Sequence, residues 1–420
     1  MNKYKKFFDL AHSKGLKNIQ ITEITIIEKG AKLINGKLIN EDYANNVHYN
    51  IQSDYNKGTI KTTTNYLDEN VIDILLEKGK YLKNKKIEIL KDLSKNNNDN
   101  SSKNILDIED AINENTKFNK LLQDNDVLTC YISSKYSKVR IINELGVDIS
   151  SSSLQNGFSS EVIVKRNGEV KVGCNNILFN DNINYTEFVN NLINETLMSL
   201  NEYSIESKKY KVLFKNSEMS IILRKLVPYL NLEKIKNKTS FLDNKLNKKI
   251  FSDKLTIIES PLDKSMPGYR VFDDEGTSTY NKTIVENGNL ITYLCDNKTA
   301  KENNVNSTGN SYGGVSTRNM YIKPGNYSYD ELLEKLDNGI IVTDIFSNYN
   351  IDTKDSKASF QAYGLLVENG KVKGGLKSFI VTTSYFDLFN NIEEIGNDLL
   401  FNNVTCASPS VIVNDVDITI

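Results

Sequence analysis

The chain has 420 residues, with 52 Lys and Arg against 54 Asp and Glu and a formal net charge of -2. This length exceeds that of one ordinary core and predicts two domains. A near-neutral chain has no global attraction for nucleic acid or an anionic membrane, so we expect neither as a partner. The mean hydropathy is -0.43, no apolar run is long enough for a membrane helix, and the N-terminus does not resemble a signal peptide. We therefore expect a cytoplasmic protein.

The first half of the chain mixes helical and strand patterns. Apolar residues three and four positions apart predict helices, and alternating apolar and polar residues predict strands. We expect helices at 3–14, after an N-cap at Asp68, at 108–122 and after an N-cap at Thr186. We expect strands at 19–28, 47–51, 58–64, 127–132 and 139–142, with hairpin turns at Asn35-Gly36 and Asn167-Gly168. The polar tract 96–104 predicts a surface loop.

The second half is richer in strand patterns. We expect a strand at 210–214, a helix at 217–229, mostly strands from Leu255 onward, and hairpin turns at Asn287-Gly288 and Asn369-Gly370. Ser328 and Glu331 have the spacing of a capping box. They predict a helix that ends at Gly339 and is followed by a strand at 340–346.

A polar stretch at 201–209 separates the two patterns. The sequence therefore predicts an α+β protein of two domains. The first is an N-terminal α/β-mixed domain over 1–205, and the second is a β-rich C-terminal domain over 206–420.

Histidine and cysteine usage limits the chemistry of the second half. The chain has two histidines, His12 and His48, and both lie in the first 50 residues. The four cysteines are far apart and form no C-x-x-C pair, so we expect reduced and mostly buried thiols. A Cys-His hydrolase built on Cys295 or Cys406 would need a histidine from the other domain, which makes this class unfavourable.

Three polar motifs remain in the second half. Residues 309–313 match G-x-S-x-G, but polar residues precede them and no histidine follows, so a glycine-rich loop is favoured over a nucleophile elbow. Residues 273–276 place three carboxylates beside a glycine, which is typical of a solvated turn and also of a cation-binding loop. Arg318 either clamps a carboxylate or carbonyl of a ligand or pairs with an acidic cluster within the protein.

A set of C-terminal motifs, in this order and spacing, resembles the TldD/PmbA family. The motifs are Phe272-Asp273-Asp274-Glu275-Gly276-Thr277, Val285-Glu286-Asn287-Gly288, Arg318-Asn319-Met320-Tyr321 with Pro324-Gly325, residues 364–370, Ile395-Gly396-Asn397-Asp398 and Pro409-Ser410. The resemblance is strong from about residue 261 onward and looser, but collinear, over the N-terminal half.

The resemblance implies a two-domain protein that forms dimers, often a heterodimer of a TldD-type and a TldE (PmbA)-type chain. It implies a zinc metalloprotease complex that cleaves unfolded or extended peptides. In this family the TldD-type chain binds zinc through H-E-x-x-x-H on a helix and a cysteine near the C-terminus. The TldE-type chain lacks that site and completes the substrate cavity.

In this sequence the corresponding helix begins at Ser217. This start puts Ser217 and Ile222 at the two histidine positions and Glu218 at the glutamate position. Cys406 matches the region of the C-terminal cysteine, but one thiolate cannot hold catalytic zinc without nitrogen partners. The resemblance therefore implies a TldE-type chain with no catalytic residue and no metal of its own, and zinc in a TldD-type partner.

Our leading hypothesis is a non-metal subunit of a TldD/TldE-type peptidase that processes unfolded or extended peptides. Sheet edges can bind such a peptide as an added strand. We expect Arg318, Asp274 and Glu275 to line the peptide cavity. The alternative is a homodimeric peptide-binding or chaperone-like protein without hydrolytic activity, and a weaker one is a metal-independent hydrolase. The sequence leaves open whether the partner is a TldD-type chain or a second copy, and whether the chain has any activity alone.

Overall fold

A computed structural model describes residues 3–56, 58–81, 89, 122–166, 168–180, 183–346 and 349–420. The first half contains the helices α1 (Lys3–Ser13), α2 (Glu69–Gly79) and α4 (Tyr185–Met198). Its strands are β1 (Lys17–Ile34), β2 (Lys37–Tyr55), β3 (Gly58–Thr64), β4 (Val127–Asn143), β5 (Asp148–Arg166) and β6 (Glu169–Phe179).

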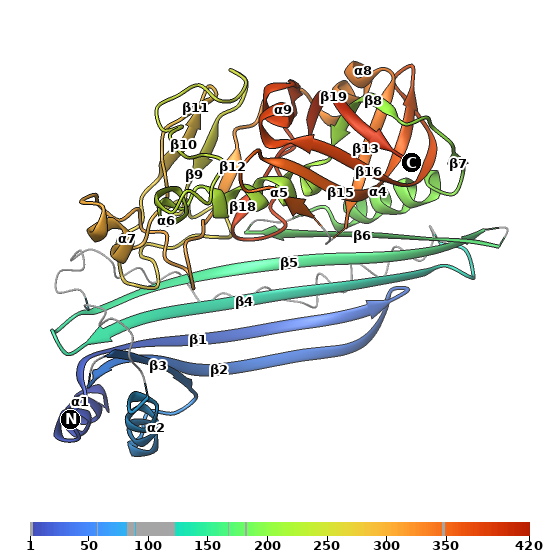
Figure 1. The fold of residues 1–420 in the computed structure, drawn as a ribbon. Coiled ribbons are helices and arrows are strands. Elements are labelled where there is room, and N and C mark those ends of the chain that lie inside the picture. The colour runs from blue at the N-terminus through green and yellow to red at the C-terminus, as the bar shows by residue number, and fades with distance from the viewer. Residues whose placement is uncertain are drawn as a thin grey trace.

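The six strands form one antiparallel sheet in the order β3-β2-β1-β4-β5-β6. Figure 1 shows long, twisted strands that run side by side across the lower part of the molecule, with α1 and α2 at one end. The Asn35-Gly36 turn joins β1 and β2, and both residues have positive φ, as such two-residue turns require. The sheet is therefore a broad surface with few helices on it.

Helices cover the two ends of this sheet. α1 and α2 pack over Ile19 and Ile21 of β1, whereas α4 packs over β4 and β5 at the opposite end, against residues such as Phe158. The Asp68 side chain accepts a hydrogen bond from the Val71 amide and caps α2. Two separate apolar clusters thus hold the ends of the sheet.

The second half contains shorter elements. The helices are α5 (Asn216–Leu226), α6 (Leu232–Lys236), α7 (Asn297–Glu302), α8 (Tyr329–Leu336) and α9 (Tyr385–Asn390). The strands are β7 (Glu202–Tyr203), β8 (Lys208–Phe214), β9 (Ile257–Glu259), β10 (Lys282–Glu286), β11 (Asn289–Leu290), β12 (Met320–Ile322), β13 (Gly339–Ile345), β14 (Asn350–Ile351), β15 (Lys357–Glu368), β16 (Lys371–Ser384), β17 (Ile392–Ile395), β18 (Cys406–Ala407) and β19 (Val411–Thr419).

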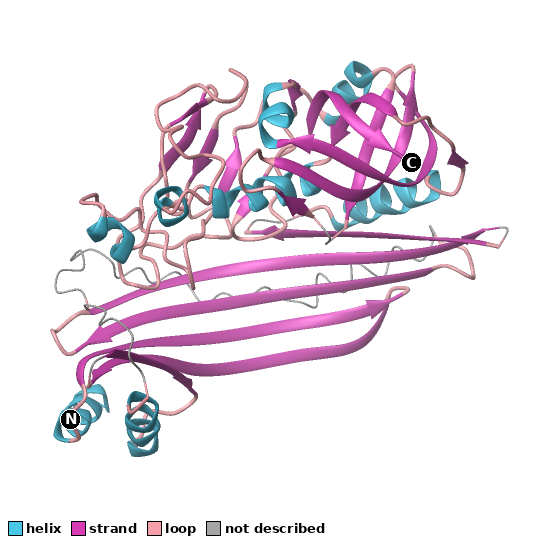
Figure 2. Ribbon diagram, in the orientation of Figure 1, coloured by secondary structure: helices cyan, strands magenta, loops and turns pink. Residues whose placement is uncertain are grey.

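Five of these strands close into a ring. The pairing order is β15-β13-β8-β19-β16, and β16 pairs back to β15. A smaller sheet, β11-β10-β9-β12-β18, lies beside it (Figures 1 and 2). One large apolar core joins the ring, the smaller sheet and α5, and a second cluster packs α8 on the ring. α5 therefore runs through the middle of the larger core.

The two halves contact each other along the sheet. The Leu178 amide of β6 donates to the Phe401 carbonyl at 2.7 Å, and the Gln155 amide nitrogen donates to the Pro267 carbonyl at 2.7 Å. Phe272 of the second half packs against Ile141 and Ile149 on the sheet. Figure 1 shows the second half lying along β6 and β5.

The structure confirms the predicted α+β fold class with several sheets. The hairpins at Asn287-Gly288 and Asn369-Gly370 and the capping box of α8 are also confirmed. The expected loop at 96–104, most of the expected helix at 108–122 and Asn167 lie outside the described residues.

Several predicted boundaries are wrong. The expected strands 127–132 and 139–142 are parts of one strand, β4. The serine and lysine residues between them largely continue its alternation of buried and half-buried side chains. The N-cap of α4 is Asn184, whose side chain accepts from the Glu187 amide, rather than Thr186. α8 ends at Leu336, its C-cap Asp337 takes the positive φ expected of a glycine, and Gly339 already begins β13.

Candidate functional site

A cleft of about 440 Å³ lies between the six-stranded sheet and the start of α5. It is lined by Thr129, Tyr131, Ser159, Ser160, Glu161, Cys174, Asn175, Asn176, Ser217, Glu218, Ile221, Asp344 and Asn402. These residues come from β4, β5 and β6 on one side and from α5, β13 and the segment before β18 on the other. The cleft thus lies where the two halves of the chain meet.

Strand register builds the sheet wall of the cleft. Thr129 pairs with Glu161, and Glu161 pairs with Cys174, so these three side chains point to the same face of the sheet. The Cys174 thiol contacts Glu161 Oε2 at 3.7 Å. Asn176 lies one pair further along and donates to the Asn402 carbonyl at 2.8 Å, which holds the opposite wall in place.

Two motif residues near the C-terminus fix the start of α5. Ser410 Oγ donates to Asp398 Oδ2 at 2.6 Å and accepts from the Asn216 amide at 3.1 Å. Asn216 Nδ2 also donates to the Asp398 carbonyl at 3.0 Å. Because β19 and the segment before β18 hold these groups, the first turn of α5 is set against the sheet wall.

Glu218 forms the helix wall of the cleft and is 5% exposed. Its Oε1 accepts a hydrogen bond from Ser217 Oγ at 2.8 Å, while the buried Oε2 has no partner among the described residues. Burial raises the pKa of Glu218 to about 7; the hydrogen bond from Ser217 opposes this rise and the charge of Asp344 adds to it. Burial also raises the pKa of Asp344. The cleft is therefore acidic in composition and holds carboxyl groups that resist ionisation.

Cys406 lies beside α5 but away from the motif positions expected from the sequence. It is fully buried, and its carbonyl accepts from Ser220 Oγ at 3.1 Å. Burial raises the pKa of its thiol to about 12, and the charge of Arg224 acts in the opposite direction. Ser217 instead lines the cleft, and Ile222 is buried in the apolar core. The structure therefore does not bring Ser217 and Ile222 to Cys406.

The side chains around Cys406 do not fit a zinc ion. The Cys406 thiol lies 3.7 Å from Thr317 Oγ1, and Ser220 adds a second neutral hydroxyl at the Cys406 carbonyl, whereas catalytic zinc takes histidine, cysteine or carboxylate ligands. In the described part of the chain, no group of three His, Cys, Asp or Glu side chains could hold a metal. His12, the first of the two histidines, contacts Glu144 at 2.6 Å at the far end of the six-stranded sheet.

Arg318 lies in an unusual stack of cations and an aromatic ring. Its guanidinium carbon is 4.8 Å from the centre of the Tyr312 ring, and that of Arg270 is 5.5 Å from the same ring. Arg270 pairs with Asp274 at 2.8 Å. Within the described residues Arg318 has no ion pair, and the buried Nε atoms of both arginines and the Tyr312 hydroxyl have no partner. Burial, followed by the charge of Arg270, lowers the pKa of Arg318.

The Glu275 side chain is hydrogen-bonded to the start of α7 and not to the arginines. Its Oε2 accepts from the Asn297 amide at 3.0 Å and from Asn297 Nδ2 at 2.9 Å at the start of α7. Asp273 organises the turn: Oδ1 accepts from the Glu275 and Thr277 amides, and Oδ2 from the Ser311 amide. Of the three predicted cavity residues, Arg318 and Asp274 are therefore linked through Arg270, and Glu275 is separate.

A buried ion pair lies next to the backbone of Arg318. Lys282 Nζ lies 2.8 Å from Glu259 Oε2, and the two side chains are 4% and 1% exposed. Glu259 also accepts from Asn310 Nδ2 at 2.8 Å and from the Arg318 amide at 2.8 Å. The backbone at Arg318 is therefore held rigidly although its guanidinium is not.

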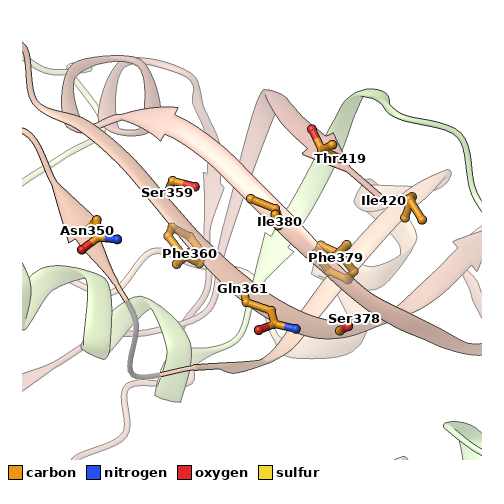
Figure 3. Close-up of a pocket in the computed structure, with 9 residues that line it drawn as sticks. All are labelled: Asn350, Ser359, Phe360, Gln361, Ser378, Phe379, Ile380, Thr419 and Ile420. Atoms are coloured by element: carbon orange, nitrogen blue, oxygen red, sulfur yellow. The ribbon is translucent and has the colours of Figure 1, made fainter.

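A second cavity, of about 370 Å³, lies on the strand ring (Figure 3). It is lined by Asn350, Ser359, Phe360, Gln361, Ser378, Phe379, Ile380, Thr419 and Ile420. None of these lining residues has an ionisable side chain. The cleft beside α5 is the stronger candidate because it combines carboxylates, a thiol and a buried oxygen without a partner.

Sequence reasoning missed most of the cleft. Glu161, Cys174 and Asp344 gave no motif signal, because they come from three strands that meet only through pairing. Ser220, which donates to the Cys406 carbonyl, gave no signal either, because its position on α5 alone does not reveal what that side of the helix contacts.

Comparison with known proteins identifies the family that shares this architecture. Residues 207–420 match the family model described as the PmbA/TldA metallopeptidase C-terminal domain, so the second half has a metallopeptidase-like fold. This chain belongs to the PmbA/TldD family. The resemblance inferred from the sequence motifs is confirmed.

Individual relatives match different fractions of the chain. The metalloprotease PmbA homolog of Buchnera aphidicola (subsp. Acyrthosiphon pisum) is 30% identical over 52% of this chain and 48% of its own length. The metalloprotease TldD homolog of the same organism is 32% identical over 38% of this chain and 35% of its own length. These matches thus span half or less of the relatives. The structure of TldE from Thermococcus kodakarensis aligns over 100% of both chains with a TM-score of 0.85 at 17% identity, which shows a common fold.

No helix within the described ranges is both long enough and apolar enough to cross a membrane.

Proposed function

We propose that this chain is the non-metal-binding, TldE (PmbA)-type subunit of a two-chain peptidase whose zinc is held by a TldD-type partner. The observation that carries the proposal is the side of α5 that meets Cys406. It presents Ser220, and the thiol itself meets Thr317 Oγ1, so neither contact supplies a nitrogen or sulfur ligand for zinc. The fold shared with a protein named TldE and the sequence likeness to a TldD homolog support this proposal.

The cleft beside α5 supports a role in holding unfolded or extended peptide. β6 is the last strand of its sheet and borders the cleft with Cys174, Asn175 and Asn176. Edge strands offer backbone N–H and C=O groups to an extended chain, which binds as an additional strand without close reading of its sequence. In this proposal the chain contributes substrate binding, and the partner contributes metal-activated water and a carboxylate base.

The test is hydrolysis of an unfolded protein such as reduced, alkylated casein. We expect no cleavage by the isolated chain, and cleavage that a chelator abolishes when a TldD-type chain with an intact H-E-x-x-x-H motif is added. The matched control is the same partner with the glutamate of that motif replaced by glutamine. Cleavage by the isolated chain in the presence of chelator would refute the proposal.

A homodimeric peptide-binding protein without hydrolytic activity is the second candidate. The cleft favours it because both walls come from one chain. Light scattering separates the two, since a lasting interface usually buries more than about 2,000 Å² and survives dilution. A heterodimer with the TldD-type chain supports the first candidate; a homodimer that excludes that chain and cleaves nothing supports the second.

A further inference from the structure

The cleft between the sheet and α5 has an unbalanced charge. Three carboxylates line it: Glu218 on α5, Asp344 on β13 and Glu161 on β5. Among the described residues that line it there is no Lys or Arg. Glu161 and Asp344 are exposed, whereas Glu218 is buried. A ligand in the cleft therefore meets two exposed carboxylates and one buried one.

Glu218 has capacity for one more donor. Its Oε1 accepts from the hydroxyl of Ser217, and its buried Oε2 makes no hydrogen bond in the described structure, although the Ile345 amide lies near enough to the carboxyl to lower its pKa. Buried polar atoms are almost always hydrogen-bonded, so an orphaned carboxylate oxygen facing a cleft points to a missing donor. The nearby cation Lys215 does not serve, because it is paired with Glu195.

The chemistry of the cleft favours an organic cation over a metal ion as the missing donor. Divalent ions require several oxygen ligands converging at about 2.0–2.6 Å. No group of three His, Cys, Asp or Glu in the described residues has that arrangement. At about 440 Å³, the cleft exceeds the roughly 30 Å³ share of one water molecule many times over and accommodates a side chain.

We propose that this cleft binds a positively charged nitrogen of a peptide, with Glu218 Oε2 as its acceptor and Glu161 and Asp344 as the charges that attract it. This inference rests on the proposed function, because it names the peptide class that the subunit selects. The nitrogen belongs either to a lysine side chain or to a free N-terminus. Both present an ammonium group with three donors, and a cation beside Glu218 favours the ionised form of the carboxyl, which only accepts hydrogen bonds.

The experiment measures binding to the full chain by fluorescence anisotropy, with no partner present. The probe is a short Ala/Gly/Ser peptide with one lysine, an acetylated N-terminus and a C-terminal fluorophore. A second peptide replaces lysine by norleucine and keeps the acetyl group. A third has norleucine and a free N-terminus. We expect at least one ammonium-bearing peptide to bind about tenfold more tightly than the uncharged one, as a charge-assisted hydrogen bond allows.

Two variants locate the effect. Glu218→Gln removes the acceptor charge while keeping an oxygen for Ser217, and Asp344→Asn removes an exposed charge with little risk to folding. Each is expected to reduce the tenfold preference. Glu286→Gln, an exposed carboxylate on β10, is the matched control and is expected to retain it. Circular dichroism checks that each variant is folded.

The outcomes distinguish a lysine side chain from a free N-terminus as the source of the nitrogen. They also test this inference separately from the proposed function. Preference for the lysine peptide identifies a side chain, and preference for the free N-terminus identifies the α-ammonium. Equal binding of all three peptides, a preference untouched by both variants, or stoichiometric Zn²⁺ or Mg²⁺ binding lost in the same variants would overturn the inference. Because the assay uses no partner, it is independent of partner-dependent hydrolysis. A charge preference without that hydrolysis defeats only the proposed function, and the converse defeats only this inference.

Discussion

Ser220 Oγ donates a hydrogen bond to the carbonyl of Cys406 across 3.1 Å, which joins α5 to β18 inside the core. This contact defines which side of the helix meets the C-terminal cysteine. That side carries Ser220, and the Cys406 thiol lies 3.7 Å from Thr317 Oγ1, so the cysteine has neutral hydroxyls for neighbours. The consequences for metal content follow from this relationship.

We expect the purified chain to contain no stoichiometric zinc. A buried thiol whose pKa is raised to about 12 is protonated at neutral pH, and zinc binds the thiolate. Elemental analysis after dialysis against metal-free buffer measures the content. About one zinc per chain would contradict the assignment and would direct the search to His12, His48 and Cys406.

The Glu218 carboxyl predicts a pH-dependent stability. Its pKa is raised from an ordinary 4.5 to about 7 in the folded chain, so the folded state binds a proton that the unfolded state releases. This contribution is fully present below pH 4.5 and is lost as the pH rises through 7. The free energy of unfolding of wild type relative to Glu218→Gln should fall by about 2–3 kcal/mol across this window. Urea unfolding at a series of pH values measures the difference.

The matched comparison for Glu218 is Glu286→Gln on β10, where the carboxyl is exposed. Its stability difference from wild type is expected to stay flat between pH 4.5 and 7. A flat difference for Glu218→Gln as well would show that the Glu218 carboxyl is ionised as easily in the folded as in the unfolded chain.

We expect a large loss in the free energy of unfolding when one partner of the Lys282–Glu259 pair is removed. Lys282→Met leaves the Glu259 carboxylate buried without its cation and should lower the free energy of unfolding by about 3 kcal/mol. In the double variant Lys282→Met/Glu259→Gln, the neutral amide keeps an acceptor oxygen for Asn310 and the Arg318 amide. The double variant is therefore expected to be more stable than Lys282→Met. Equal stabilities of the two would mean that the charge of Glu259 carries no cost.

For Arg318 we expect the opposite result, namely that removing the charged side chain costs little stability. Its half-buried guanidinium lies over the Tyr312 ring near Arg270, and its buried Nε has no acceptor among the described residues. Arg318→Met therefore removes a charge without an ion pair in the described structure and keeps contact with Tyr312. The free energy of unfolding should stay within about 1 kcal/mol of wild type. If Arg318 lines the shared peptide cavity, turnover of the complex with a TldD-type chain should fall. A loss of several kcal/mol would instead assign Arg318 a structural role.

Local sequence patterns determined the elements whose physics acts within a few residues. The capping box of Ser328 and Glu331 and the positive-φ turns at Asn287-Gly288 and Asn369-Gly370 are set by neighbouring backbone and side-chain atoms. The ordered motifs near the C-terminus likewise sufficed to identify the family. The absence of histidine after residue 50 already limited the metal chemistry of the second half.

Only the tertiary structure decided which residues share a site. The cleft joins Glu161, Cys174, Glu218 and Asp344 through strand pairing and helix packing, and no local pattern encodes such distant contacts. The start of the α5 helix was predicted to within one residue, yet its rotation was not, so Ser217 faces the cleft and Ser220 faces Cys406. A helix turns by about 100° per residue. A shift of three residues in the sequence alignment leaves the predicted helix unchanged. It nevertheless brings a different side chain toward Cys406 and so changes the role inferred for each residue of the helix.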